Sequence, residues 1–173
     1  MRHVGAILAM VLAIAAAPAA AGEPPGPVTI AFQASGTVRD QYSASTSGTF
    51  NMTGRFSDAG NMRTTYRFAG THLGASAMIM GARGIFTISM RGTLGPIVEG
   101  HQSASGRWRL CGGTGAYRSA RAGGMWESAA DVRAAPVGMT MPAMRGTYYG
   151  RFARGPAVKH AGSLGVSCTP GVT

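Results

Sequence analysis

The chain has 173 residues, of which 45% are hydrophobic, 13% are charged and 27 are glycine. This composition argues against a long coiled coil and against a wholly disordered chain, and it fits one compact domain. Sixteen Lys and Arg against six Asp and Glu give a formal net charge of +10, which favours anionic partners. The arginines are scattered singly, however, so no specific nucleic-acid footprint is expected.

The first residues predict a signal peptide over residues 1–21. Residues 1–3 form a short basic start, residues 4–17 are apolar without a charge, and residues 19–21 are the small residues that a signal peptidase requires. The apolar run is shorter than the ~20 residues that a membrane-spanning helix needs, so no membrane span is expected. We therefore expect a secreted or periplasmic protein.

From residue 28 onward, apolar and polar residues alternate with a period of two, which is typical of strands with one buried face. The first predicted strands cover residues 28–35, 50–56 and 62–68, and Ser57, Asp58, Ala59 and Gly60 predict a hairpin turn between the last two. Further strands are predicted over residues 76–80, 85–91, 107–111, 116–121, 125–128 and 146–152.

Glycines recur inside these runs, at Gly54, Gly84, Gly124 and Gly150. A strand interior normally avoids glycine unless the sheet bends sharply, and repeated bending predicts closure into a barrel. The predicted fold class is therefore all-β, a single antiparallel barrel of eight or nearly eight strands over residues 22–154.

Residues 129–144 break the alternation and contain two prolines, so they predict a long loop before the last strand. Met139, Met141 and Met144 lie in this segment. Thioethers are soft ligands that select Cu(I), so a copper site is one interpretation. Methionine is also an adaptable apolar filler, which favours the other interpretation, a lid packed on the barrel mouth without metal.

The chain has two cysteines, Cys111 and Cys168. In an oxidising compartment such a pair is normally bridged, and closing this loop would stabilise the fold by roughly 4 kcal/mol on the chain-entropy model. We expect the disulfide to attach the tail, residues 155–173, to the barrel.

Two neighbouring segments resemble a known signature. Residues 106–110 read Gly-Arg-Trp-Arg-Leu, and residues 113–121 read Gly-Thr-Gly-Ala-Tyr-Arg-Ser-Ala-Arg, with Gly124 beyond them. Together they resemble the central signature of the allene oxide cyclase and dirigent barrel superfamily, which includes secreted bacterial members. Residues 84–88 and 146–150 are similar to flanking strands of those members, and Ala122 stands where the family usually has glycine.

The resemblance covers about residues 30–152. It implies an eight-stranded antiparallel barrel with a hydrophobic cavity, often a homo-oligomer in the plant members, whose enzymes guide reactions of bound lipophilic substrates. Glu99, Glu127 and Asp131 match no catalytic motif of the family, so the catalytic residues stay unknown.

Other chemistry has little support in the sequence. Residues 112–116 form a glycine-rich turn but lack the Gly-Lys-Ser/Thr ending of a phosphate-binding loop. His72, His101 and His160 stand alone, and neither a serine nucleophile elbow nor a His-Glu zinc motif occurs. No cofactor is expected.

The expected function is binding of a small lipophilic molecule in the barrel interior. The interior candidates are Tyr66, Phe68, Phe86, Ile88, Trp108, Tyr148 and Phe152. The hydroxyls of Tyr66 and Tyr148 could orient the polar end of a ligand. Three alternatives stay open: the same residues fill a solid core, the cavity belongs to a cyclase or isomerase, or the outer surface binds Cu(I) or a polyanion.

Overall fold

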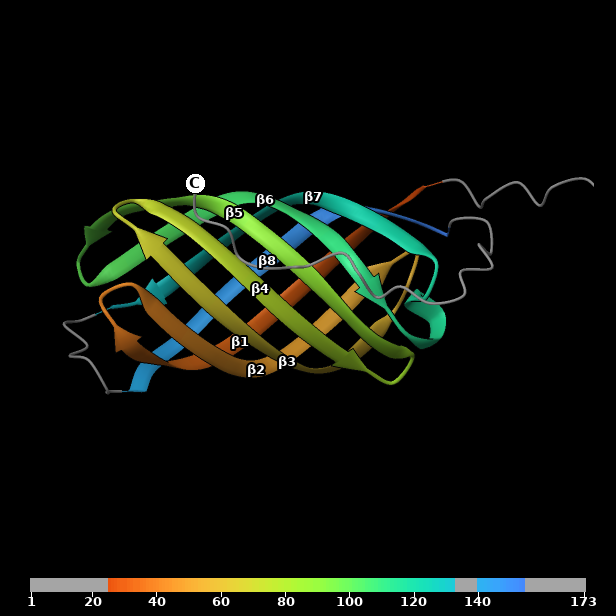
Figure 1. Ribbon diagram of the computed structural model, residues 1–173, viewed down its shortest axis with the longest axis horizontal. Coiled ribbons are helices and arrows are strands. Elements are labelled where there is room, and N and C mark those ends of the chain that lie inside the picture. The colour runs from red at the N-terminus through yellow and green to blue at the C-terminus, as the bar shows by residue number, and fades with distance from the viewer. Residues whose placement is uncertain (1–24, 133–139, 155–173) are drawn as a thin grey trace, which may run out of the picture.

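The computed structural model describes residues 25–132 and 140–154. Within these ranges the chain forms eight strands and one short 3-10 helix: β1 (Gly26–Asp40), β2 (Ser43–Gly54), β3 (Asp58–Ala69), β4 (His72–Gly81), β5 (Gly84–Val98), β6 (His101–Gly113), η1 (Gly115–Tyr117), β7 (Ala120–Asp131) and β8 (Thr140–Arg154). Consecutive strands pair antiparallel, and β8 also pairs with β1, so the sheet closes into a barrel (Figure 1). The predicted all-β antiparallel barrel of eight strands is confirmed.

The barrel has two ends, which differ in their connections. The η1 end holds the connections β2–β3, β4–β5 and β6–β7, the last of which contains η1 (Figure 1). The opposite end, here the Glu99 end, holds the connections β1–β2, β3–β4 and β5–β6. Glu99 lies in the last of these connections and has a positive φ of 50°, which is uncommon for a residue with a side chain.

Two predicted strand borders near the start of the barrel are wrong. Residues 43–49, for which the sequence predicts no strand, form the first part of β2 because ladders with both β1 and β3 hold this Ser-, Thr- and Gly-rich run extended. The predicted turn from Ser57 to Gly60 is misplaced, since β3 already begins at Asp58 and the connection is residues 55–57.

Two further predictions fail in the second half of the barrel. Residues 116–121 are not a strand over most of their length, because η1 forms a helical turn in which the Tyr117 N–H donates to the carbonyl of Thr114. The predicted loop over residues 129–144 is too long at both ends, since β7 continues to Asp131 and β8 begins at Thr140. At the two ends of this loop, the ladders of β7 with β6 and of β8 with β1 extend the strands beyond the alternating apolar pattern.

The two tryptophans each lie across glycines of the neighbouring strands. Trp108 on β6 stands in register with Gly124 on β7, which pairs with Gly150 on β8. The Trp108 indole lies over Gly150, where an added Cβ would come within 2.7 Å of the ring, and its Nε1 donates to the carbonyl of Tyr149 at 3.1 Å. Glycine at position 150 therefore makes room for the ring.

Trp126 repeats this arrangement in the opposite direction. It stands on β7 in register with Gly106 on β6, which pairs with Gly92 on β5. Its Nε1 donates to the carbonyl of Arg91 at 3.3 Å. The pair of crossed indoles thus links β5 to β8 on the inner face of the barrel.

Several predicted features lie outside the described residues: the signal peptide of residues 1–21, the tail of residues 155–173, Cys168 and Met139. Cys111 lies on β6, and its disulfide with Cys168 stays a prediction. Within the part of the chain that the structure describes, no helix is long and apolar enough to span a membrane.

Candidate functional site

The predicted interior residues all face the inside of the barrel. Six of them are buried, and Phe68 is half-buried beside the core: Tyr66, Phe86, Ile88, Trp108, Tyr148 and Phe152 are each at most 5% exposed. Tyr148 stacks on Phe32 with ring centroids 5.1 Å apart, and Tyr66 stacks on Phe68 at 6.2 Å. Ring contacts also join Phe86, Phe152, Trp108 and Tyr148 in one series along the interior.

The η1 end is closed by a buried carboxylate and aromatic rings. The Asp58 carboxylate accepts hydrogen bonds from the hydroxyl of Tyr117 at 2.7 Å and from the backbone N–H groups of Ala59, Ala82 and Arg83 at 2.9 to 3.2 Å. The Tyr117 ring packs against Phe86, at 4.6 Å between centroids. Because these four donors satisfy both carboxylate oxygens, Asp58 acts as a structural part of a plug that closes this end.

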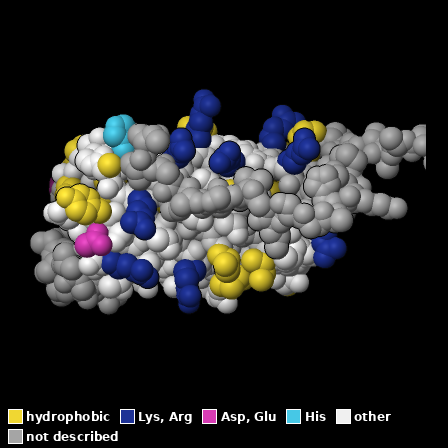
Figure 2. Space-filling model, in the orientation of Figure 1, with side chains coloured by type: hydrophobic (Ala, Val, Ile, Leu, Met, Phe, Trp, Pro, Cys, Tyr) yellow, Lys and Arg dark blue, Asp and Glu magenta, His cyan; other side chains and the backbone are white. Residues whose placement is uncertain are grey.

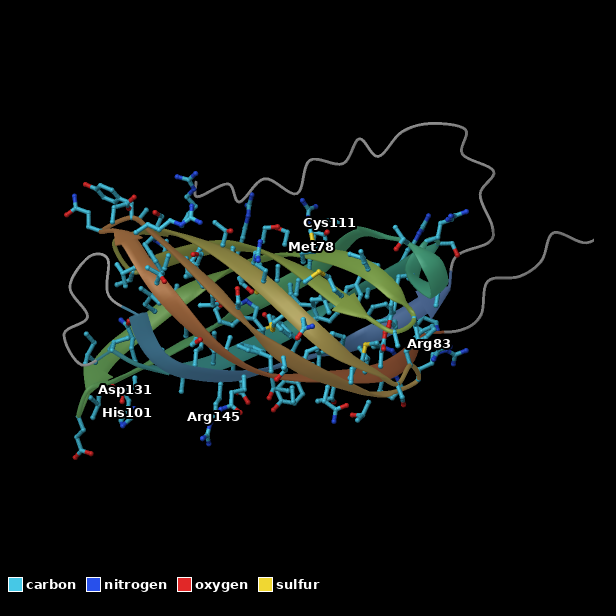
Figure 3. All side chains as sticks on the ribbon, turned by 90° about the horizontal axis from the view of Figure 1, so that it is seen from below. Met78, Arg83, His101, Cys111, Asp131 and Arg145 are labelled. Atoms are coloured by element: carbon cyan, nitrogen blue, oxygen red, sulfur yellow. The ribbon has the colours of Figure 1, made fainter. Side chains whose placement is uncertain are left out.

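Arginine and phenylalanine complete the plug. The Arg83 guanidinium lies 5.8 Å from the centre of the Phe56 ring, and Figure 3 shows Arg83 at this end of the barrel. Phe56 and Phe152 pack edge to face at 5.4 Å. Ligand entry through the η1 end would have to separate these rings.

Toward the Glu99 end, the inward side chains become smaller. We call this region the small-residue half and define it by the inward residues Ala34, Ala44, Thr46, Ala75, Ala104, Ser128 and Ala130. The large buried residues of this region are Tyr66, Leu73, Trp126 and Met144, and Val38, Phe68 and Leu94 are half-buried beside them. Ala104 and Ser128 face inward yet are only half-buried, so solvent reaches the inner face at these positions.

A group of hydroxyls lies in the small-residue half. Thr46 on β2 and Thr64 on β3 are direct register partners, 2% and 0% exposed, and neither Oγ1 has a hydrogen-bond partner. The Tyr66 hydroxyl donates to the thioether of Met144 at 3.3 Å, a weak acceptor. We call Thr46, Thr64 and Tyr66 the hydroxyl cluster.

Small neighbours surround this cluster on the adjoining strands. Tyr66 stands between Ala44 and Ala75 in the ladders. Thr64 stands beside Ala77, and a side chain at Gly36 would overlap the methyl group of Thr46. The adjoining strands therefore offer the two threonine hydroxyls no polar side chain, and the Tyr66 hydroxyl is the polar group beside them.

Burial raises the pKa of three tyrosines, so their hydroxyls stay protonated at a higher pH than those of exposed tyrosines. Burial raises the pKa of Tyr66, although the nearby Thr46 and Thr64 hydroxyls partly oppose this effect. Burial also raises the pKa of Tyr148 well above its usual value, and the proximity of Tyr66 adds to it. For Tyr117, burial together with the hydrogen bond to Asp58 raises the pKa.

These shifts predict a loss of stability in alkali. The unfolded chain ionises its tyrosines near pH ~10, whereas the folded chain keeps these three protonated, so the unfolded state binds fewer protons above that pH. The free energy of unfolding should be constant below about pH 9 and should fall as the pH rises above about 10. Urea unfolding across this range measures the effect, and Tyr66→Phe should reduce the slope. Phenolate absorbance from all five tyrosines in the still-folded protein would contradict it.

The predicted copper ligands are not brought together by the described residues. Met139 lies outside them, and the side chain of Met141 is not described. Met144 faces inward, is 8% exposed and accepts the Tyr66 hydrogen bond. The Cu(I) site stays a prediction.

A groove of about 610 Å³ crosses β6, β7, β8 and β1, and its lining includes the inward-facing Ala104 and Ser128 of the small-residue half. Most of the residues that line the groove are exposed and have small side chains, as at Ala31, Ser103 and Ser105. Two of the lining residues are charged, Glu127 and Arg145. The Tyr149 hydroxyl donates to Glu127 at 2.9 Å, and Figure 3 shows Arg145 pointing away from the barrel. This groove is open, unlike the enclosed pockets that hold lipophilic ligands.

The arginines project from the outer face, and Figure 2 shows them standing apart on the visible side. The closest approach by register is between Arg91 on β5 and Arg107 on β6, which are exposed and directly opposite. Like charges in this position destabilise a sheet unless an anion binds between them. Polyanion binding at this pair stays a prediction.

Three residues at the Glu99 end were singled out by the sequence for their chemistry. His101 and Asp131 are cross-strand partners on β6 and β7, and Figure 3 shows both at this end. Their separation of thirty positions gave no signal of this pairing, which follows only from the register. Glu99 is exposed and lies in the adjoining connection, whereas Glu127 belongs to the outer groove. None of these acids faces the hydroxyl cluster.

Sequence reasoning placed Tyr66 and Thr64 on the inner face of their strand but did not identify Thr46 or Asp58 as important. Thr46 lies in a polar run without alternation, and the residues around Asp58 are typical of a turn. Comparison of the chain with models of known families, with curated proteins and with solved structures gave no match.

Proposed function

We propose that the protein binds a small lipophilic molecule in the small-residue half of the barrel. The observation that supports this most strongly is the pair of unpartnered hydroxyls on Thr46 and Thr64. A buried hydroxyl without a hydrogen bond costs roughly 1–3 kcal/mol. Two such groups side by side in an apolar interior are explained if a bound molecule supplies their partner.

The asymmetry of the interior supports the same proposal. Large rings and the Asp58 network fill the η1 end, while alanines and threonines line much of the other half. An eight-stranded barrel is just wide enough either to be filled by side chains or to hold one small ligand. Reduced side-chain volume at one end favours a ligand there.

Filling the small-residue half provides the test. Ala104 faces inward on β6 and is half-buried, and its neighbour Ser105 faces outward and is exposed. If the half takes a ligand, Ala104→Phe should weaken binding of an uncharged, environment-sensitive naphthalene dye at least tenfold and leave the thermal midpoint nearly unchanged. Ser105→Phe is the matched control and should change neither property.

A solid core predicts a different result. Overpacking a filled interior costs typically ~1–3 kcal/mol, so Ala104→Phe would then lower the thermal midpoint. The proposal would be wrong if this variant were destabilised and the wild-type protein did not bind the dye.

We also propose that the chain is an exported member of the allene oxide cyclase and dirigent barrel superfamily. The barrel topology agrees with that resemblance. The segments that carry the resemblance, residues 106–110 and 113–121, run from the end of β6 through η1 into β7. Trp108 is the inner-face residue of this region that crosses to β8. Amino-terminal sequencing of the protein from its host would test the predicted cleavage after residue 21.

A further inference from the structure

The hydroxyl cluster carries no charge, and no charged side chain of the described residues lies beside it. Of the described residues that are nine-tenths buried, Asp58 is the charged one, and it lies in the plug at the η1 end. Arg67 and Arg91, on the same strands as parts of the small-residue half, are exposed on the outer face. No described cation therefore faces the cluster.

We propose that the bound molecule presents an uncharged oxygen, an alcohol or a carbonyl, to Thr46, Thr64 and Tyr66, and that it is not a carboxylate. This inference rests on the proposed function. The ligand oxygen would replace the Met144 thioether as acceptor of the Tyr66 hydroxyl. An alcohol would in addition donate to one of the two threonine hydroxyls, which can both donate and accept.

Charge selectivity follows from the absence of a compensating cation. Moving a carboxylate from water into an apolar site is costly unless it is paired with a cation or receives several hydrogen bonds. The desolvation free energy of an uncharged oxygen is far smaller, and such an oxygen can form hydrogen bonds with the same hydroxyls. The site should therefore prefer the alcohol to the carboxylate of equal chain length.

The test compares decan-1-ol with decanoate at neutral pH, each displacing the naphthalene dye from the full chain. We expect decan-1-ol to bind at least tenfold more tightly. Thr64→Val keeps the shape of the side chain and removes its hydroxyl. We expect this variant to bind decan-1-ol at least fivefold more weakly. Its thermal midpoint should rise slightly, because a buried hydroxyl without a hydrogen bond is removed. Thr53→Val, at an exposed position of β2, is the matched control and should change neither.

The outcomes separate the two proposals. If decanoate binds as tightly as decan-1-ol, the inference about the uncharged oxygen is wrong while ligand binding stands. If decan-1-ol binds equally well to Thr64→Val, the polar end does not lie at the hydroxyl cluster, and the inference is also wrong. If neither compound displaces the dye and Ala104→Phe still binds it, the proposed function itself fails.

Discussion

Replacing Asp58 by alanine is expected to lower the free energy of unfolding by about 3–5 kcal/mol, because each buried donor left without an acceptor costs ~1–3 kcal/mol. The carboxylate accepts from the Tyr117 hydroxyl and from three backbone N–H groups, and the residue is 8% exposed. A loss of this size is a large part of the stability of a single domain, typically ~5–15 kcal/mol. Urea unfolding followed by tryptophan fluorescence would measure it.

Two further variants keep this prediction testable even if Asp58→Ala fails to fold. Tyr117→Phe removes one of the four hydrogen bonds and should cost about 1–2 kcal/mol. Asp40→Ala, at an exposed position with local hydrogen bonds to Tyr42 and Ser43, should change stability far less. Equal effects of Asp58→Ala and Asp40→Ala would show that the η1 end is not held by the buried carboxylate.

A methyl group at Gly124 is expected to destabilise the barrel by roughly 3 kcal/mol, the upper end of the range for overpacking. The Cβ of an alanine here would overlap the carbonyl oxygen of Tyr149 on the neighbouring strand and crowd the backbone of Gly150. The Tyr149 carbonyl also accepts the Trp108 indole hydrogen bond, so relief of the overlap would move both the ladder and the ring.

Gly112→Ala is the matched control for Gly124→Ala. It also lies in a strand, at the end of β6, but an added Cβ meets nothing within 4 Å. Its free energy of unfolding should stay within about 0.5 kcal/mol of wild type, as for ordinary surface substitutions. Similar losses in the two variants would mean that the cost is general to strand glycines and is not caused by overlap with the Tyr149 carbonyl.

The barrel was predictable because its main signal is local. Alternation at Val28, Ile30 and Phe32 follows from the pleat of a single strand, and these residues are buried as expected. Strand borders failed where the sequence lacks that signal, as in residues 43–49, which the ladders with β1 and β3 hold extended. The chain was also expected to bend at its glycines, whereas Gly150 leaves space for the Trp108 ring and Gly124 allows the close approach of the backbone at Tyr149.

The candidate site was less predictable, since its features depend on partners far apart in sequence. Asp58 and Tyr117 are separated by 59 positions, and Tyr66 and Met144 by 78. Ser57, Asp58 and Gly60 have the composition of a turn, which concealed the buried carboxylate. Thr46 and Thr64 meet through the register of β2 and β3, so their missing hydrogen bonds could not be read from either segment alone.

Native mass spectrometry of the protein purified gently from its own host tests most directly whether the barrel interior holds a ligand. We predict a bound organic molecule of a few hundred daltons in the wild-type protein, the scale of a pocket ligand, and no such molecule in Ala104→Phe prepared in the same way. Ser105→Phe should retain it. A wild-type protein with the mass of the chain alone, or an adduct that persists in Ala104→Phe, would contradict ligand binding in the small-residue half.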